Sequence, residues 1–422
     1  MAKLALLGGK QVVQIPYETA KKETVSERAI ESIVELCKKD EISISPIVNE
    51  FEKAWGSYVG AKYSLATNNG TASIAEALFA VGVQPKDEVI VPSFTFIFSA
   101  APIASVGATA VFCDVDIDTH TMDPADIERR ITPKTKAILI VHTWGNVADM
   151  DGIMAVAKKH NLRVIEDCSH AHGAEWKGKK VGTIGDVGCF SLQGSKSLPA
   201  GEGGILVTDN REYYERAIIY GHYERVGTLP ENSKYRKYWT SMGYKHRAHP
   251  LGIAIAYEEL KSLDDYNAMR FANGKFLDDS LRDIDCITPV KSPEGTVRQY
   301  SYHYGHYDET KLDGIALNTF LQALKAEGVM VGENGYGFLH EAALFEENQE
   351  GRLPLPNTLY LRERAFMMAP RFEKECKELL MQYAEAYHKV CRNIDELHDY
   401  ENRKSKEGLS EAKKEYRSVN LL

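Results

Sequence analysis

The sequence predicts an α/β fold, in which helices sandwich a large, mostly parallel sheet and a smaller α/β domain follows toward the C-terminus. Short apolar runs alternate with amphipathic segments through the first half of the chain, which is typical of strand–helix–strand units. Near residue 250 this alternation gives way to longer helices and shorter strands. A chain of 422 residues is also long enough for two or three domains of ordinary size.

Six apolar runs in the first half of the chain have the length and composition of buried strands. They cover residues 88–91, 110–115, 137–141, 163–166, 188–192 and 204–208. Helices are expected between many of them. Asp123 and Pro124 are typical of a helix cap and a first helical turn, and apolar residues recur at helical spacing from 151 to 160.

The C-terminal part is expected to combine a long helix at 250–263, a strand at 300–304 and a helix at 319–327. The final residues are dense in Lys, Glu and Arg, which indicates a solvated helix or a frayed tail. The expected division is an N-terminal arm at 1–20, a large domain at 21–255, a smaller domain at 256–398 and a charged tail or helix at 399–422.

Composition and charge exclude several classes of protein. Apolar residues make up 44% and charged residues 26% of the chain, so extensive disorder is not expected. The formal net charge of −9 gives no electrostatic basis for nucleic acid or an anionic membrane as the main partner. The seven cysteines form no C-x-x-C pair, and the apolar stretch 4–7 is too short for a signal-peptide core. These features favour a cytoplasmic protein with reduced thiols.

The segment 89–113 carries no charged residue and is long enough to span a membrane. Pro92 and Pro102, together with several Ser, Thr and Gly residues, interrupt it. We therefore interpret the segment as a strand, a turn, a buried helix and a second strand rather than as a membrane span.

Polar residues that follow the apolar runs mark the candidate site, because open parallel sheets bind ligands at the carboxyl ends of their strands. One run leads into Glu166 and Asp167, and a carboxylate at this edge needs a cationic partner. A strand-end acid that only caps the next loop is the alternative. Lys196 follows a later run, where burial favours its neutral, nucleophilic amine; an exposed lysine in a turn is the alternative.

Two further features are expected at the same edge of the sheet. The sequence Asn69-Gly70-Thr71 opens a helix, whose free N–H groups and dipole favour a phosphate, although a plain capped helix has the same pattern. Aromatic residues alternate just beyond a strand at 94, 96 and 98. One such ring is placed to stack on a planar heteroaromatic ring while its neighbours fill the core, and core packing is the alternative for each.

Together these positions supply a phosphate cradle, a stacking ring, a carboxylate and an amine, which are the groups that pyridoxal phosphate requires. The histidines are mostly isolated and give no convincing metal site. The sequence also lacks the G-x-x-x-x-G-K-[ST] loop of nucleotide-hydrolysing enzymes. We therefore expect a pyridoxal-phosphate enzyme without a metal.

Residues 42–389 resemble the DegT/StrS-type sugar aminotransferases, which are pyridoxal-phosphate enzymes of the type I aspartate-aminotransferase fold. The resemblance is strongest between Asn69 and Asp209. It is carried by Asn69-Gly70-Thr71, Asp87-Glu88-Val89-Ile90-Val91-Pro92, Ala148-Asp149-Met150-Asp151, Glu166-Asp167 and the block 191–204. The resemblance implies the type I fold and a homodimer with shared active sites.

The resemblance also implies roles for individual residues. Lys196 is expected to be the Schiff-base lysine and proton shuttle, and Asp167 the partner of the pyridine nitrogen. Phe96 is expected to stack on the cofactor ring. His170 occupies a position near the ring hydroxyl where the family commonly has glutamine.

The same resemblance assigns the cofactor phosphate to the backbone of Gly70 and Thr71 and to the hydroxyl of Ser191. Lys245 stands where the family usually has an asparagine that reaches this phosphate across the dimer interface, and its positive charge suits the same purpose. The loop 145–149 lacks the proline that is common there, which leaves its role in substrate binding open.

The implied function is the transfer of an amino group from L-glutamine or L-glutamate to a ketone on a cyclitol similar to scyllo-inosose, or on a sugar, in aminoglycoside-type biosynthesis. Gln193 is similar to the branch that acts on keto-cyclitols, whereas many sugar-nucleotide members have histidine there. A nucleotide-linked keto-sugar aminotransferase and a pyridoxal-phosphate dehydratase remain alternatives. Members that dehydrate carry histidine in place of the lysine. A non-catalytic sugar-binding or regulatory protein on the same fold is the alternative from a different class.

Overall fold

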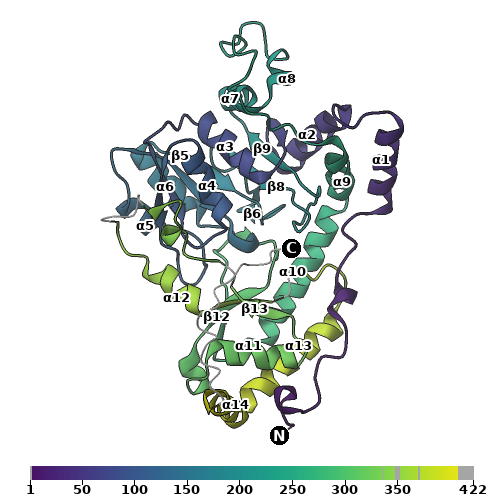
Figure 1. The fold of residues 1–422 in the computed structure, drawn as a ribbon, viewed down its shortest axis with the longest axis vertical. Helices are drawn as coiled ribbons and strands as arrows, with labels where there is room; N and C mark the ends of the chain where they lie inside the picture. Colours follow the sequence, from purple (N-terminus) through teal and green to yellow (C-terminus); the bar gives the residue numbers. More distant parts are fainter. Residues whose placement is uncertain (1, 335, 347–351, 369–370, 407–422) are drawn as a thin grey trace.

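The computed structural model describes residues 2–334, 336–346, 352–368 and 371–406. A broad region at the top of Figure 1 holds most of the blue and teal part of the chain. A narrower region below it holds most of the green and yellow part, together with the N-terminus. The chain therefore has the large and small α/β regions that the sequence predicts.

A seven-stranded sheet forms the centre of the broad region. Its strand order is β1, β9, β8, β5, β4, β2, β3. All strands point in the same direction except β9, which is antiparallel to both β1 and β8. The bounds are Tyr63–Thr67 for β1, Gly204–Thr208 for β9, Val187–Ser191 for β8, Arg163–Asp167 for β5, Thr135–Val141 for β4, Glu88–Pro92 for β2 and Thr109–Cys113 for β3. All six predicted strands are confirmed. The edge strand β1 was not predicted, because its short, mixed sequence gives little local signal.

Helices cover both faces of this sheet (Figure 1), as predicted. They are α2 Pro46–Val59, α3 Gly70–Ala80, α4 Ile97–Ser105, α5 Pro124–Arg129, α6 Met150–His160, α7 Arg211–Gly221 and α9 Pro250–Leu260. Ile138 of β4 belongs to the core that includes α2, α6 and α9. The next residue, Leu139, belongs to the core of the opposite face with α3, α4 and α7. The two-residue alternation of a strand thus divides the apolar side chains between two layers.

The predicted cap of α5 is confirmed, because the Asp123 side chain accepts a hydrogen bond from the Ala125 N–H at 2.9 Å and Pro124 opens the helix. The uncharged segment 89–113 forms β2, α4 and β3, as predicted. Among the residues that the structure describes, no helix is long and apolar enough to cross a membrane.

The narrower region contains a four-stranded antiparallel sheet in the order β10, β12, β14, β13. Its strands are β10 Ile287–Pro289, β12 Tyr304–Tyr307, β14 Ala365–Met368 and β13 Val331–Glu333, and its main helices are α10 Leu263–Ser280, α11 Leu317–Ala326, α13 Lys377–Arg392 and α14 Ile394–Lys406. Leu4, Val13 and Tyr17 are buried in the same core as α11 and α13. The segment that contains Leu4, Val13 and Tyr17 therefore packs onto the narrower region, beside α11 and α13.

Three predicted elements of this region are shifted. The strand expected at 300–304 begins only at Tyr304, because the residues before it are held by side-chain contacts; the Tyr300 hydroxyl, for example, donates to Asp278. The helix expected at 250–263 ends at Leu260, and α10 begins at Leu263. The charged tail begins inside α14, and its residues 407–422 lie outside the described part of the chain.

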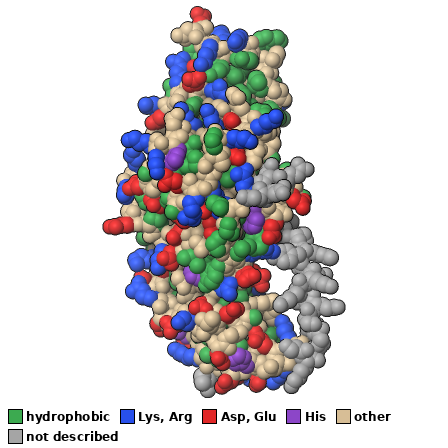
Figure 2. All heavy atoms as spheres, turned by 90° about the vertical axis from the view of Figure 1, so that its left-hand side faces the viewer, with side chains coloured by type: hydrophobic (Ala, Val, Ile, Leu, Met, Phe, Trp, Pro, Cys, Tyr) green, Lys and Arg blue, Asp and Glu red, His purple; other side chains and the backbone are tan. Residues whose placement is uncertain are grey.

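The remaining helices are α1 Glu27–Lys38, α8 Tyr223–Val226 and α12 Pro356–Arg364, and a small sheet pairs β11 Thr296–Val297 with the hairpin of β6 Glu175–Trp176 and β7 Lys179–Lys180. On the face that Figure 2 shows, basic and acidic side chains are intermingled from end to end. This face therefore carries no field of a single sign.

Candidate active site

Three segments that are far apart in the sequence meet at the carboxyl ends of β5 and β8. Asp167 is the last residue of β5 and lies opposite Cys189 of the neighbouring strand β8. Ser191 ends β8, and the first turn of α3 lies directly against it. A Cβ atom at Gly70 would lie 2.9 Å from the Ser191 Cβ, so only glycine permits this approach.

The two carboxylates at the end of β5 have different environments, because successive side chains of a strand point to opposite faces. The Glu166 carboxylate accepts backbone hydrogen bonds from Gly182 at 2.8 Å, Ile184 at 2.8 Å and Gly185 at 2.6 Å. Glu166 is therefore the structural acid that sequence analysis left as one alternative. Asp167 is the carboxylate that faces the site.

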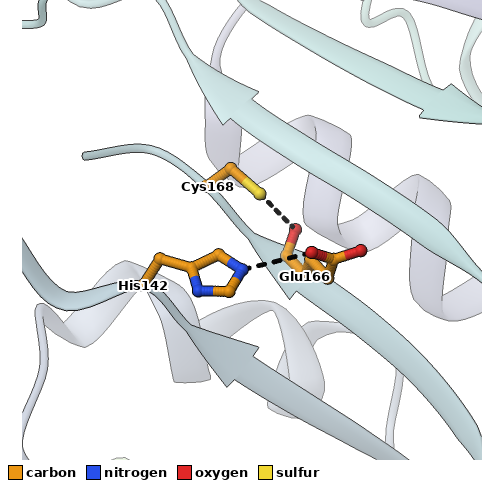
Figure 3. A group of neighbouring side chains, drawn as sticks. All are labelled: His142, Glu166 and Cys168. Atoms are coloured by element: carbon orange, nitrogen blue, oxygen red, sulfur yellow. Dashed lines mark hydrogen bonds and ion pairs between the residues drawn. The ribbon is translucent and has the colours of Figure 1, made fainter. Parts of the chain in front are cut away.

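Glu166 also belongs to a buried group with His142 and Cys168, whose ligand atoms lie within 4.8 Å of one another (Figure 3). The atoms of His142 and Glu166 that could bind a metal already take part in hydrogen bonds. His142 Nε2 lies 3.1 Å from Glu166, and the Ala148 N–H donates to His142 Nδ1 at 3.2 Å. Burial raises the pKa of Cys168, so its sulfur remains a thiol. We interpret this group as a structural network rather than as a metal site.

Asp167 is 3% exposed and is held by two donors. The Ser99 hydroxyl of α4 donates to Oδ2 at 2.6 Å, and the Ser169 N–H donates to Oδ1 at 3.0 Å. A buried carboxylate needs a cationic partner, and the electrostatic partner of Asp167 in the site is Lys196. The Lys196 amine is within electrostatic range of Asp167, but in the described part of the chain the two groups form no direct ion pair.

Lys196 lies in the loop that follows β8 and is half-buried. Burial lowers the pKa of the Lys196 amine. The negative charge of Asp167 raises this pKa and the positive charge of Arg371 lowers it, and the net result is a pKa of about 8. A substantial fraction of the amine is therefore neutral and nucleophilic in mildly alkaline solution. The alternative of an ordinary exposed lysine does not describe this environment.

His170 is half-buried beside Lys196. Burial lowers the pKa of its imidazole well below the usual value, and the positive charge of Lys196 lowers it further. The imidazole is therefore neutral. The Trp144 N–H donates to His170 Nδ1 at 3.4 Å, which leaves the proton on Nε2. Such a group can donate one hydrogen bond to a ligand oxygen.

The first turn of α3 has the features of an anion site. The Asn69 side chain accepts from the Ala72 N–H at 2.8 Å, while the N–H groups of Gly70 and Thr71 at the helix start have no acceptor within the helix. Ser191 is held in place because His172 Nε2 donates to its backbone oxygen at 2.8 Å. This arrangement suits a phosphate.

The three alternating aromatic residues have different environments. Phe94 is buried among Trp144, His120 and Tyr336. Phe96 is half-buried at the start of α4 and packs edge-to-face on Phe98 with ring centres 5.3 Å apart. Phe98 is 50% exposed, so the expectation that both neighbours of Phe96 fill the core is wrong for Phe98. The reason is that α4 begins at Ile97 and turns this side chain outward.

Lys245 is exposed, in a segment that passes beside the start of α3. The Asn68 N–H donates to the His246 carbonyl oxygen at 2.7 Å, and Thr67 pairs with Arg247. The neighbours of Lys245 in the sequence thus lie beside the start of α3, Lys245 itself is on the surface, and its predicted role toward a second subunit stays a prediction.

The loop that lacks the expected proline is held by its own polar contacts. Gly145 has a positive φ of 90°, and a Cβ atom there would lie 1.6 Å from the Gln299 carbonyl oxygen. The Asn146 amide donates to the carbonyl oxygens of Thr119 and Lys291, each at 2.9 Å. These contacts describe a structural loop.

Sequence reasoning missed three residues of the site. Ser99 gave no signal, because it lies in an uncharged helix and meets Asp167 only through the fold. Arg371 lies 175 residues beyond Lys196 and donates to its backbone oxygen at 2.6 Å. Trp144, which follows β4, has a left-handed φ of 48° and stacks on Tyr336 with ring centres 4.8 Å apart. Strained non-glycine residues of this kind gather at functional sites.

Comparison with known proteins identifies the family of this chain. The model of the DegT/DnrJ/EryC1/StrS aminotransferase family matches residues 23–380. The chain belongs to this family.

Two relatives show what kinds of protein this chain is similar to. An L-glutamine:2-deoxy-scyllo-inosose aminotransferase of Streptoalloteichus tenebrarius is 36% identical over 312 residues, which are 72% of this chain and 73% of that protein. A GDP-perosamine synthase of Caulobacter vibrioides is 41% identical over 229 residues, which are 54% of this chain and 60% of that protein.

Solved structures agree with the fold. The aminotransferase from Psychrobacter cryohalolentis matches with a TM-score of 0.81 and 28% identity, over 88% of this chain and 98% of that chain. The structure of DesI in the presence of its TDP-sugar product matches with a TM-score of 0.81 and 26% identity, over 94% of this chain and 99% of that chain. The type I fold predicted from the sequence is confirmed.

Pyridoxal phosphate is the cofactor of this DegT/DnrJ/EryC1/StrS aminotransferase, and the geometry of the site fits it. A buried carboxylate is available for a protonated ring nitrogen, an amine with a lowered pKa is available for the aldehyde, and glycine keeps the anion site open. These features match the needs of the cofactor in charge, chemistry and space.

Proposed function

We propose that this aminotransferase moves an amino group from L-glutamine or L-glutamate to the ring ketone of a cyclitol similar to scyllo-inosose. The observation that carries the substrate class is the 36% identity to an L-glutamine:2-deoxy-scyllo-inosose aminotransferase over 72% of the chain. Gln193, three residues before Lys196, supports it; its amide oxygen accepts from the Ser195 N–H at 2.8 Å, and its side chain is exposed. We also propose a cytoplasmic role in aminoglycoside-type biosynthesis.

We assign the catalytic roles to Lys196 and Asp167. When bound, pyridoxal phosphate supplies a ring that accepts electrons from the carbon that bears the amino group. The neutral Lys196 amine would attach the cofactor through its aldehyde, and the freed amine would carry a proton from the donor's α carbon to the cofactor. The Asp167 carboxylate, which Ser99 and Ser169 hold in place, would face the ring nitrogen. His170 would donate from Nε2 to the ring hydroxyl.

We assign the phosphate to the N–H groups of Gly70 and Thr71 and to the Ser191 hydroxyl, and the stacking contact to Phe96. The first turn of α3 supports the first assignment, because its N–H groups and helix dipole favour an anion. Phe96 is half-buried at the carboxyl end of β2, on the edge of the sheet where Asp167 ends β5. Its edge-to-face contact with Phe98 leaves a ring face for a ligand.

We further propose a homodimer in which Lys245 reaches the partner's phosphate. The segment that begins with α8 projects from the top of the molecule beyond α7 (Figure 1), and it returns to the start of α3 at His246 and Arg247. It exposes large apolar side chains, of which Trp239 is 75% exposed, and the others are Tyr223, Tyr238, Met242 and Tyr244. Several large apolar side chains exposed on one segment favour association with another protein surface.

A nucleotide-linked keto-sugar is the second candidate acceptor. The 41% identity to a GDP-perosamine synthase and the likeness to DesI, solved with a TDP-sugar, favour it. A dehydratase is less well supported, because Lys196 is present. A non-catalytic protein on this fold predicts no reaction with an amino donor.

The test uses the purified protein with bound pyridoxal phosphate. L-glutamine labelled with 15N at its α-amino group should convert the bound cofactor, followed by visible absorbance, and a keto-cyclitol should restore the absorbance while the label appears in a ring amine. Restoration by a nucleotide-linked keto-sugar alone supports the second acceptor. Loss of ring oxygen without transfer of label supports a dehydratase, and no conversion by either amino donor contradicts the proposal.

A further inference from the structure

Arg371 reaches the Lys196 loop from a distant part of the chain. Its Nη1 donates to the Lys196 backbone oxygen at 2.6 Å across 175 residues of sequence. The Lys196 N–H meanwhile donates to the Gln193 oxygen at 2.8 Å within the loop itself. Both backbone polar groups of Lys196 are therefore held, and the contact that comes from outside the loop is a charged one, which is stronger than a neutral hydrogen bond.

Arg371 is itself fixed by the N-terminal segment. The Tyr17 hydroxyl donates to the Arg371 carbonyl oxygen at 2.9 Å and accepts from the Arg371 N–H at 3.3 Å. The Tyr17 ring is buried and packs edge-to-face on Phe372, with ring centres 5.9 Å apart. Tyr17, near the N-terminus, thus holds the backbone of Arg371, and Arg371 in turn holds the backbone of Lys196.

The charge of Arg371 is only partly neutralised. Its Nε lies 3.8 Å from Glu373 Oε1, but the same oxygen is in direct contact with Arg270 Nη2. Arg270 is buried as well. Two guanidinium groups therefore share one carboxylate, and the cluster keeps a net positive charge next to the Lys196 loop.

We propose that Arg371 is a positioning residue, which fixes the backbone of Lys196 and holds its side chain ready to attach the cofactor, and that Tyr17 fixes Arg371 in turn. The inference rests on the proposed assignment of Lys196 as the attachment site. The charged and titratable groups that face the Lys196 amine are Asp167, His170, His172 and Arg371. Burial lowers the pKas of both histidines, so Asp167 and Arg371 are the charges that act on the amine. The positive charge of Arg371 favours the neutral amine.

The experiment measures attachment of pyridoxal phosphate to the full-length protein after the cofactor has been removed. The rate of appearance of visible absorbance is recorded from pH 6 to pH 10, which gives a midpoint for the amine and a limiting rate above it. Borohydride reduction and mass spectrometry locate the attached residue. The variants are Arg371→Gln, Arg371→Lys and Tyr17→Phe. Arg282→Gln is the matched control, because Arg282 is 78% exposed beside Asp279.

Arg371→Gln is expected to raise the midpoint by about half a pH unit or more, because a nearby positive charge is lost. It is also expected to slow attachment near pH 7 by about threefold to tenfold, since less of the amine is neutral there. Arg371→Lys should keep the midpoint and lower the limiting rate, because the charge remains while the bond geometry is lost. Tyr17→Phe should act like Arg371→Lys, and Arg282→Gln should change neither quantity.

An unchanged midpoint and limiting rate in Arg371→Gln would overturn the inference, as would a variant that only raises the KM for the amino donor. If Arg371→Gln fails to fold, Arg371→Lys and Tyr17→Phe decide the question through their limiting rates. Attachment of the wild-type protein at a residue other than Lys196 would contradict the proposed function instead, so the two failures are distinguishable.

Discussion

The Ser99 hydroxyl lies 2.6 Å from Asp167 Oδ2 and donates to it from the buried side of α4. Ser99 and Asp167 are 68 residues apart in the sequence, and both are almost fully buried. The hydroxyl therefore orients the carboxylate without exposing it to water. This contact links the uncharged helix α4 to the end of β5.

The Ser99 contact predicts graded effects on turnover. Asp167→Asn removes the negative charge beside the ring nitrogen and should lower kcat by about 100-fold or more. Ser99→Ala removes only one hydrogen bond and should lower kcat by about tenfold. Ser99→Thr keeps the hydroxyl and is the control. Steady-state kinetics with bound cofactor measure these effects, and near-normal turnover in Asp167→Asn would remove the assigned role of this carboxylate.

Lys196 should be the residue to which the cofactor is attached. Because its pKa is about 8, the neutral fraction of the amine increases as the pH rises through this value. We expect the attachment rate to increase about tenfold per pH unit below 8 and to level off above it. Lys196→Ala should abolish the label that borohydride fixes on the wild-type protein, while thermal melting shows that the variant is folded. A label that persists in this variant would show that another amine is the nucleophile.

Gly70→Ala should weaken binding of the cofactor. The added Cβ lies 2.9 Å from the Ser191 Cβ and 3.0 Å from its Cα, so the start of α3 must move away from the end of β8. We expect the Kd for pyridoxal phosphate to rise by about tenfold or more. Gly227→Ala is the control, because a Cβ at Gly227 meets nothing within 4 Å. Equal affinity of the two variants would argue against a phosphate site at α3.

The buried group around Glu166 should be insensitive to metals. Zinc or a chelator is expected to leave the melting temperature of the cofactor-free protein unchanged, because the ligand atoms already serve hydrogen bonds. Glu166→Gln leaves backbone N–H groups without an acceptor and should cost about 3 kcal/mol in the free energy of unfolding. Thermal and denaturant unfolding measure both effects. A melting temperature that rises with zinc would identify a metal site instead.

Stability should depend on pH through His222. Burial lowers the pKa of this histidine, but contacts with Glu76 at 2.9 Å and Glu224 at 3.7 Å raise it to about 9, above the ordinary value of 6.5. The native state therefore binds its proton more tightly than the unfolded state. The stabilisation, about 3 kcal/mol, is complete below pH 6.5 and is lost as the pH rises through 9.

Denaturant unfolding between pH 6 and pH 9.5 measures this effect. His222→Gln should flatten the profile, whereas His249→Gln, at an exposed position, should keep it. A wild-type profile that stays flat over this range would contradict the buried ion pair.

Much of the large sheet could be predicted from the sequence, because its strands are continuous apolar runs buried on both faces. The edge strand β1 and the first residue of β12 could not be predicted in this way. Both strands are short segments of mixed polar and apolar residues, which form strands only because they pair with neighbouring strands. The strand pattern alone could not tell whether Glu166 or Asp167 faces the site; the family resemblance was needed to choose Asp167. The choice depends on which side of β5 faces three backbone N–H groups and which side faces Lys196.

The α/β fold class, the positions of the strand ends and the residue types found there could be predicted without a structure, because apolar periodicity and local capping are properties of short segments. The contact of Ser99 with Asp167, the contact of Arg371 with Lys196 and the contact of Tyr17 with Arg371 could be seen only in the folded structure. These contacts join residues that are 68 to 354 positions apart, and no local pattern encodes such a distance. They form because burial of two cores brings the segments together, after which unpaired polar groups must find partners.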